Sequence, residues 1–85
     1  MAFVFIQNGG YCEWYLHVHD TRTAADKHRA SCHRASYSTS DTVEVPEGID
    51  FDALTARVED GRIGDDDWTE ARAVLKCAAA GVVLD

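Results

Sequence analysis

Histidine and cysteine side chains are the groups in this sequence that could bind a metal ion. The chain has four histidines and three cysteines, and two pairs are regularly spaced. His28 and Cys32 lie four positions apart, so they would share one face of a helix, whereas His17 and His19 lie two apart and would share one face of a strand. Imidazole nitrogen and thiolate sulfur are ligands that zinc prefers. The two pairs would offer four ligands if they met.

The predicted packing keeps the two pairs apart. In the strand that contains His17 and His19, Trp14 lies on the opposite, more apolar face. We expect the helix to pack on the Trp14 face, so that His28 and Cys32 would not reach the strand histidines. The chain also contains no CxxC or HxxH pair. A core-facing His28 and an inert Cys32 account for the pattern, and we predict no metal ion and no cofactor.

The cysteines give little support to nucleophilic catalysis. A thiol nucleophile needs a lowered pKa and a neighbouring histidine. Cys32 has His28 and His33 nearby in the sequence, but it lies in the middle of a predicted helix. Cys12 falls in a predicted strand and Cys77 on the last predicted helix. No GxSxG, HExxH or phosphate-binding glycine loop is present, so we predict that the protein is not an enzyme.

The segment VEDGRIGDDDW (58–68) has some features of a calcium loop. Gly61 would take the sharp turn of an EF-hand, but the first two ligand positions would then fall on Ala56 and Val58, which have no side-chain oxygen. We interpret the segment as a turn between two helices. Gly61 would end the first helix, and the aspartates 65–67 would cap the second at its positive dipole end.

This part of the chain resembles the SHOCT family of short helical hairpins. The matching positions are Leu54, Gly61, Ile63, Asp66, Trp68, Leu75 and Lys76. The resemblance covers about a quarter of the chain, and Trp68 stands where the family usually has phenylalanine. It implies packing or self-association, not catalysis. Separately, KHRASCHRASYSTS followed by VEVP is similar to stretches in small uncharacterised proteins of actinobacterial phages, a resemblance that carries no known activity or site.

The N-terminal half predicts a hairpin, a helix and a short strand. The apolar run AFVFIQ and the alternating run YCEWYLHVHD flank Asn8-Gly9-Gly10, whose residues tolerate the positive φ of a tight turn. Residues 23–34 lack glycine and proline and start at Thr23, a suitable N-cap, so they predict a helix. The run TVEV predicts one further strand, which Pro46 ends.

The C-terminal half predicts two helices. Asp50 is a suitable N-cap for the first, with Phe51, Leu54 and Val58 on one face. The second starts after the aspartates, ends at Gly81 and carries an apolar face formed by Trp68, Ala71, Val74, Leu75 and Ala78. We therefore predict a single α+β domain of order ββαβαα. Residues 1–45 would form a small antiparallel sheet with one helix, and residues 46–85 an acidic helical hairpin.

Charge is concentrated in the second half of the chain. The formal net charge is −7, and residues 1–42 carry four basic and four acidic groups, so residues 43–85 account for all of it. This balance argues against direct binding of nucleic-acid phosphates. No apolar run approaches the roughly 18 residues of a membrane span, and the N-terminus lacks the basic region of a signal peptide. We expect a cytoplasmic protein with reduced thiols and no contact with membranes.

These features favour a small non-enzymatic interaction module. It would be a phage-encoded protein that binds a host protein, or one that forms a homo-oligomer. Two surfaces could carry the interface. One is an aromatic sheet face, formed by Phe3, Phe5, Tyr15 and His17, unless later helices cover it; the other is the acidic hairpin, with Asp65, Asp66, Asp67 and Trp68. Two alternatives stay open: an acidic mimic of nucleic acid that blocks a basic groove, and a small metal-binding or thiol-dependent protein.

Overall fold

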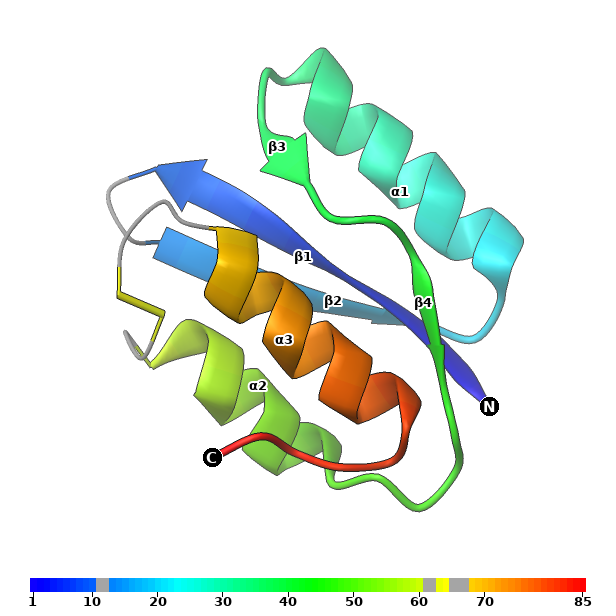
Figure 1. Ribbon diagram of the computed structural model, residues 1–85. Helices are drawn as coiled ribbons and strands as arrows, with labels where there is room; N and C mark the ends of the chain where they lie inside the picture. Colours follow the sequence, from blue (N-terminus) through cyan, green and yellow to red (C-terminus); the bar gives the residue numbers. More distant parts are fainter. Residues whose placement is uncertain (11–12, 61–62, 65–67) are drawn as a thin grey trace.

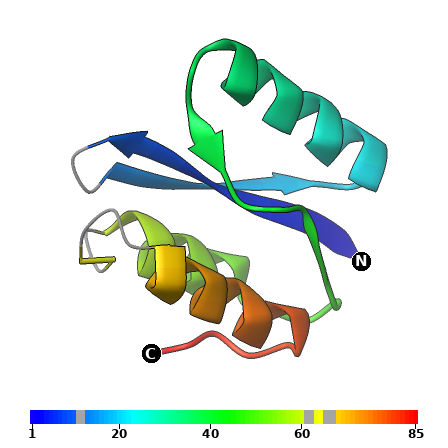
Figure 2. The ribbon, with the colours of Figure 1, turned by 45° about the horizontal axis from the view of Figure 1, so that its top comes forward.

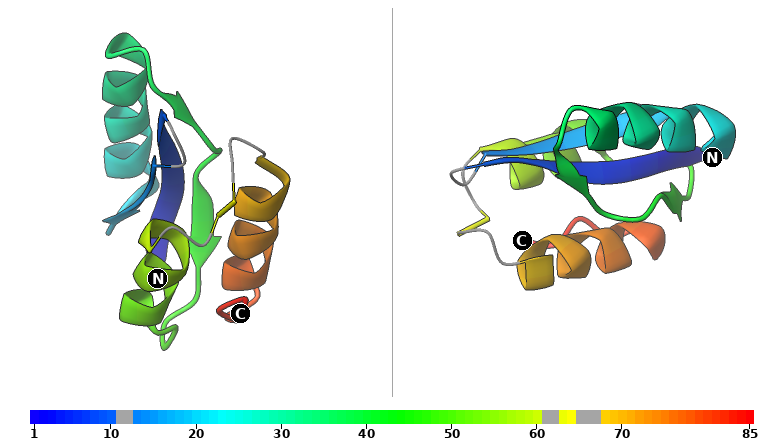
Figure 3. Two further views of the ribbon diagram at one scale, coloured as in Figure 1. Left: turned by 90° about the vertical axis from the view of Figure 1, so that its left-hand side faces the viewer. Right: turned by 90° about the horizontal axis from the view of Figure 1, so that it is seen from above.

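The computed structural model describes residues 1–10, 13–60, 63–64 and 68–85 (Figure 1). It has three layers, with the sheet between one helix and a pair of helices (Figures 2 and 3). The elements are β1 (Ala2–Gly10), β2 (Glu13–His19), α1 (Arg22–Arg34), β3 (Ser38–Thr39), β4 (Val43–Val45), α2 (Phe51–Glu59) and α3 (Trp68–Ala79). The predicted α+β class and the order ββαβαα are confirmed, with the further strand formed as two short pieces, β3 and β4.

Strand β1 is the centre of the sheet. It pairs antiparallel with β2 along one edge, and with β3 and then β4 along the other. One extra residue separates the two registers, because Gln7 pairs with Thr39 whereas Val4 pairs with Val43. A shift of one residue exchanges the faces of a strand, so this extra residue turns Val43 towards the same side as Val4. Ser40 spans the break, accepting from Ile6 N through Oγ at 2.9 Å and donating through its own N to Ile6 O at 2.8 Å.

The larger core lies between the sheet and helices α2 and α3. Its members are Val4, Ile6, Trp14, Leu16, Val45, Ile49, Leu54, Val58, Ile63, Ala71, Val74, Leu75 and Ala78. The apolar faces predicted for the two helices are therefore confirmed. Asp50 caps α2 as predicted, accepting from Ala53 N at 3.0 Å, and Gly81 follows α3 with φ at +83°. The predicted cap at Gly61 and the caps at residues 65–67 lie outside the described residues.

Helix α1 covers the opposite face of the sheet, where Phe5, Ala25 and Cys32 are buried and Phe3 packs beside them. The prediction that this helix packs on the Trp14 face is wrong, because α2 and α3 fill that face and leave the Phe5 face to α1. The helix also starts earlier than predicted. Thr21, not Thr23, is the N-cap, and its Oγ1 accepts from Ala24 N at 3.1 Å.

The hairpin is confirmed, but Asn8-Gly9-Gly10, which we predicted to form its turn, belongs to strand β1. Gly10 pairs with Glu13, and residues 11–12 lie outside the described part. Gly9 and Gly10 are instead required by the conformation and packing of β1. A Cβ at Gly9 would lie 2.7 Å from Tyr15 Cε2, and Gly10 has φ at +89° next to an irregularity in the β1–β2 register.

Candidate functional site

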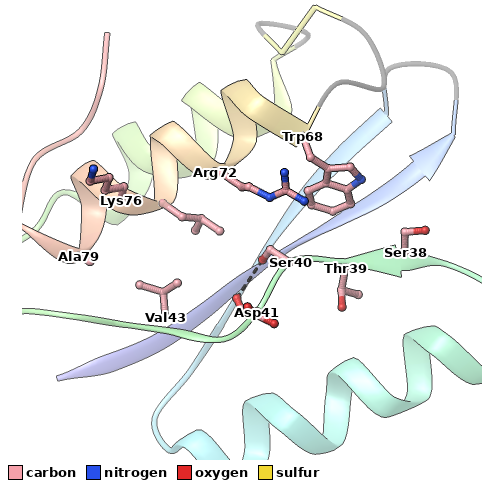
Figure 4. Close-up of a pocket in the computed structure, with 10 residues that line it drawn as sticks. Ser38, Thr39, Ser40, Asp41, Val43, Trp68, Arg72, Lys76 and Ala79 are labelled. Atoms are coloured by element: carbon pink, nitrogen blue, oxygen red, sulfur yellow. Dashed lines mark hydrogen bonds between the residues drawn. The ribbon is translucent and has the colours of Figure 1, made fainter.

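A groove lies between α3 and the residues that join β3 to β4 (Figure 4). Its volume is about 450 Å³, and it is lined by Ser38, Thr39, Ser40, Asp41, Val43, Trp68, Arg72, Leu75, Lys76 and Ala79. Val43, Leu75 and the indole of Trp68 supply apolar surface. Arg72 and Lys76 supply positive charge, and both side chains are exposed. The groove therefore combines an apolar floor with a cationic rim.

Helical spacing explains how α3 presents these side chains. Trp68, Arg72 and Lys76 follow one another at intervals of four residues, so they form one stripe along the helix. This stripe lies beside the buried one, because Leu75 belongs to the core and also lines the groove. We considered only the apolar face of α3 in the sequence, so we did not predict Arg72 and Lys76 as site residues. The pattern that could have indicated them is a stripe of two basic residues and a tryptophan in an otherwise acidic chain.

The groove is a local exception to the acidic character of the chain. Among the described residues, neither Arg72 nor Lys76 forms an ion pair. The acidic residue in the lining, Asp41, has an almost fully exposed side chain, and its Oδ1 lies 3.6 Å from Arg29 Nη2. Arg29 thus offsets part of the negative charge. Arg72 and Lys76 are therefore available to attract an anionic group.

A second group of side chains, which we call the histidine cluster, lies on the other face of the sheet, beneath α1. One candidate ligand atom from each of His17, His28 and Cys32 lies within 4.8 Å of the others. The prediction that the strand and helix pairs do not meet is therefore wrong, and its cause is the misplacement of α1. His19 joins the cluster, because its Nε2 lies 2.8 Å from His28 Nδ1. Phe5 packs against these rings, with its centroid 4.9 Å from that of His17 and 5.2 Å from that of His28.

The surroundings of this cluster favour uncharged side chains. Burial, followed by the neighbouring rings of His28 and His19, lowers the pKa of His17 to about 4. Burial, followed by His19, also lowers the pKa of His28, and burial raises the pKa of the Cys32 thiol. At neutral pH the imidazoles of His17 and His28 are therefore neutral and the Cys32 thiol is protonated.

The predicted aromatic interface is largely covered by α1. Phe5 is fully buried, and Phe3 is half-buried with the guanidinium of Arg22 at 5.2 Å from its ring centroid. His17 lies in the histidine cluster. Tyr15 is still 39 % exposed, and its hydroxyl donates to Glu13 Oε2 at 3.2 Å. Because Phe5 is enclosed, this face cannot offer it as an anchor to a partner.

The second predicted interface is described only at Trp68. This side chain is half-buried, stacks edge-on against Trp14 with a centroid distance of 4.9 Å, and lines the groove. Asp65, Asp66 and Asp67 lie outside the described residues. Trp68 therefore links the larger core to the groove.

The histidine cluster predicts that stability falls in mild acid. The folded protein binds a proton at His17 less readily than the unfolded chain, whose histidine has a pKa near 6.5, so its contribution is complete above that pH and is lost as the pH falls towards 4. Because the ring is partly exposed, we expect a loss of only about 1 to 2 kcal/mol between about pH 7 and about pH 4.5. Urea unfolding across this range, with a chelator present, measures it.

The matched variants for this measurement are His17→Gln and His33→Gln. The first should flatten the dependence of unfolding free energy on pH, because it removes the titrating ring. The second should leave the slope unchanged, because His33 lies outside the cluster and bonds Thr39 Oγ1. Equal slopes in the wild type and His17→Gln would contradict the prediction.

Within the described ranges, no helix is both long and apolar enough to cross a lipid bilayer. Comparisons of this chain with protein-family models, curated proteins and solved structures find no match. The function is therefore inferred from the chemistry of the groove and the cluster.

Proposed function

We propose that this protein is a small, non-enzymatic interaction module that binds an extended acidic segment of a partner protein in the groove beside α3. The observation that carries this proposal is the position of Arg72 and Lys76 above an apolar floor, next to a sheet edge. Peptides commonly bind by adding a strand to such an edge, with alternate side chains entering pockets.

The two edges of the sheet differ in their availability. Along the outer edge of β2, Leu16 N donates to Glu59 Oε2 at 2.8 Å, so a carboxylate from the end of α2 already occupies a backbone donor. On the other side, β3 and β4 pair only with β1 among the described strands, but in the residues that join them Thr42 O accepts from Arg22 Nη1 at 3.4 Å and Asp41 O from Ser40 Oγ at 3.0 Å. Their outer edge adjoins the groove. An incoming strand would therefore pair along β3 or β4 themselves, beside the groove side chains, and not along the residues that join them.

Charge selects the chemistry of the partner. Arg72 and Lys76 would favour aspartate or glutamate at positions that face α3, and apolar side chains would fill the floor near Leu75. The net charge of −7 repels an acidic partner at long range, so recognition depends on short-range contacts with these two cations. We expect bound segments to alternate acidic and apolar residues.

Selection from a random peptide library on the immobilised protein tests the proposal. We expect enrichment of peptides that alternate Asp or Glu with apolar residues. For a selected peptide, the double variant Arg72→Ala with Lys76→Ala should weaken binding about tenfold or more, which corresponds to roughly 1.4 kcal/mol. Fluorescence anisotropy measures the affinity.

The matched control removes two cations from a different surface. Lys27→Ala with Arg34→Ala changes the net charge equally but alters exposed positions on α1. This control should bind the peptide nearly as tightly as the wild type does, because only the weak long-range repulsion increases. Enrichment of basic peptides, or equal weakening by both double variants, would refute the groove as the binding site. If light scattering shows a dimer that the double variant on α3 dissociates, the groove binds a second copy of the chain and not a peptide of another protein.

A further inference from the structure

We propose that His17, His28 and Cys32 form a binding site for a divalent transition metal ion of the zinc type. This site lies on the face of the sheet opposite the α2 and α3 layer and is independent of the proposed peptide groove. It uses one residue of β2 and two residues one turn apart on α1. Figure 2 shows helix α1 lying over one face of the sheet. The ligand set of two imidazoles and one thiol suits zinc and cobalt, and does not suit the hard ions magnesium and calcium.

The spacing of the ligand atoms is close to what a metal ion requires. In a tetrahedral zinc site with bonds of about 2.0 to 2.3 Å, neighbouring ligand atoms lie about 3.3 to 3.8 Å apart. The candidate atoms of His17, His28 and Cys32 all lie within 4.8 Å of one another. The ligand atoms therefore need to approach one another by no more than about 1.0 to 1.5 Å, which rotations about side-chain bonds can supply.

Gln7 shows where an ion would lie. Its Oε1 is 2.7 Å from His17 Nε2 and accepts from Cys32 Sγ at 3.6 Å, so a ring nitrogen and the thiol converge on the same oxygen. A cation between these atoms would take the place of the two hydrogen bonds. Gln7 Oε1 could then serve as a fourth ligand or orient a bound water molecule.

His19 would act in the outer shell of the site. Its Nε2 lies 2.8 Å from His28 Nδ1, which leaves Nε2 of His28 as the nitrogen available to an ion. Metal-binding histidines usually have their second ring nitrogen held in this way, which sets the tautomer and the direction of the ring. The low pKa values of His17 and His28 keep both rings neutral, as binding requires. The Cys32 thiol must lose its proton, so affinity should rise with pH.

Titration of the full chain with cobalt(II) tests the site, because cobalt(II) binds the same ligands as zinc and its absorption spectrum depends on those ligands. After removal of metals with a chelator, we expect one ion per chain, the visible bands of tetrahedral cobalt, and a thiolate-to-cobalt charge-transfer band. Cys32→Ser should abolish that charge-transfer band, and His17→Gln or His28→Gln should weaken binding at least about tenfold. Zinc should displace the cobalt, whereas magnesium should not.

The chain supplies a control for each ligand type. Cys77→Ser should retain the charge-transfer band, and His33→Gln should retain the affinity. The proposal fails if Cys32→Ser keeps the band, if Cys77→Ser loses it, or if no binding occurs at micromolar cobalt. A measurement on the wild type covers the case in which a variant does not fold. Zinc should then shift the imidazole nitrogen resonances of His17 and His28 but not those of His33, and unchanged resonances would equally refute the site.

Discussion

Replacing Phe5 by alanine is expected to lower the free energy of unfolding by about 3 to 4 kcal/mol. The side chain is fully buried, and it is the largest buried member of the small core beneath α1, which otherwise contains Ala25 and Cys32. Neither smaller residue can fill the cavity that its removal would leave. An 85-residue domain has a total stability of roughly 4 to 13 kcal/mol, so this loss would be a large share of it.

Urea unfolding followed by circular dichroism measures this loss. Hydrogen exchange should show that the amides of α1 lose more protection than those of α2 and α3, because Phe5 joins α1 to the sheet. Val18→Ala is the matched control, since Val18 lies on the neighbouring strand with 43 % of its surface exposed, and its change should stay within about 0.5 kcal/mol. A loss below about 1 kcal/mol for Phe5→Ala would contradict the packing of α1 on this face.

Replacing Glu70 by alanine is expected to cost about 2 to 3 kcal/mol. Arg57 is a buried cation with only 7 % of its side chain exposed, and its Nη2 donates to Glu70 Oε1 at 2.6 Å. Removing the carboxylate leaves that charge less compensated in a poorly solvated place. The same carboxylate accepts from Gly64 N at 3.3 Å, so the connection before α3 loses a bond as well. The half-exposed position of Glu70 keeps the cost below that of a fully buried pair.

Two comparisons test the cause of this loss. Arg57→Met combined with Glu70→Leu removes both charges and should restore most of the stability, because no buried charge then remains. Glu47→Ala removes the surface partner of the N-terminal amine, a pair whose side chains are mostly exposed, and should cost no more than about 0.5 kcal/mol. If Glu47→Ala and Glu70→Ala cost the same in urea unfolding, burial of Arg57 is not the source of the effect.

Much of the local structure follows from neighbouring residues. Asp50 caps α2, and Leu54 and Val58 form its buried face, because caps and apolar stripes depend on positions within one or two turns. The apolar stripe of α3 and the pairing of β1 with β2 are likewise readable from spacing. The turn was misplaced because Asn8 to Gly10 satisfy the rules for a turn equally well, whereas the close approach of Tyr15 to Gly9 comes from the opposite strand.

The face that each helix covers could not be read in this way. Strand β1 is apolar on both sides, with Val4 on one and Phe5 on the other, so its pattern predicts that both faces are covered but not by which helix. Strands β2 and β3 lie on opposite sides of β1 and run parallel to each other, so α1 must cross β1 over one face. Helices α2 and α3 fill the other.

The sequence by itself determined which residues of the candidate sites share a strand or a helix face. His28 and Cys32 are neighbours on α1, and Arg72 and Lys76 are neighbours on α3, because helical periodicity alone sets those distances. Only the tertiary structure decided that His17 meets the first pair and that β4 faces the second. Those contacts join elements far apart in the chain, and they depend on how the layers pack, which no local pattern of residues encodes.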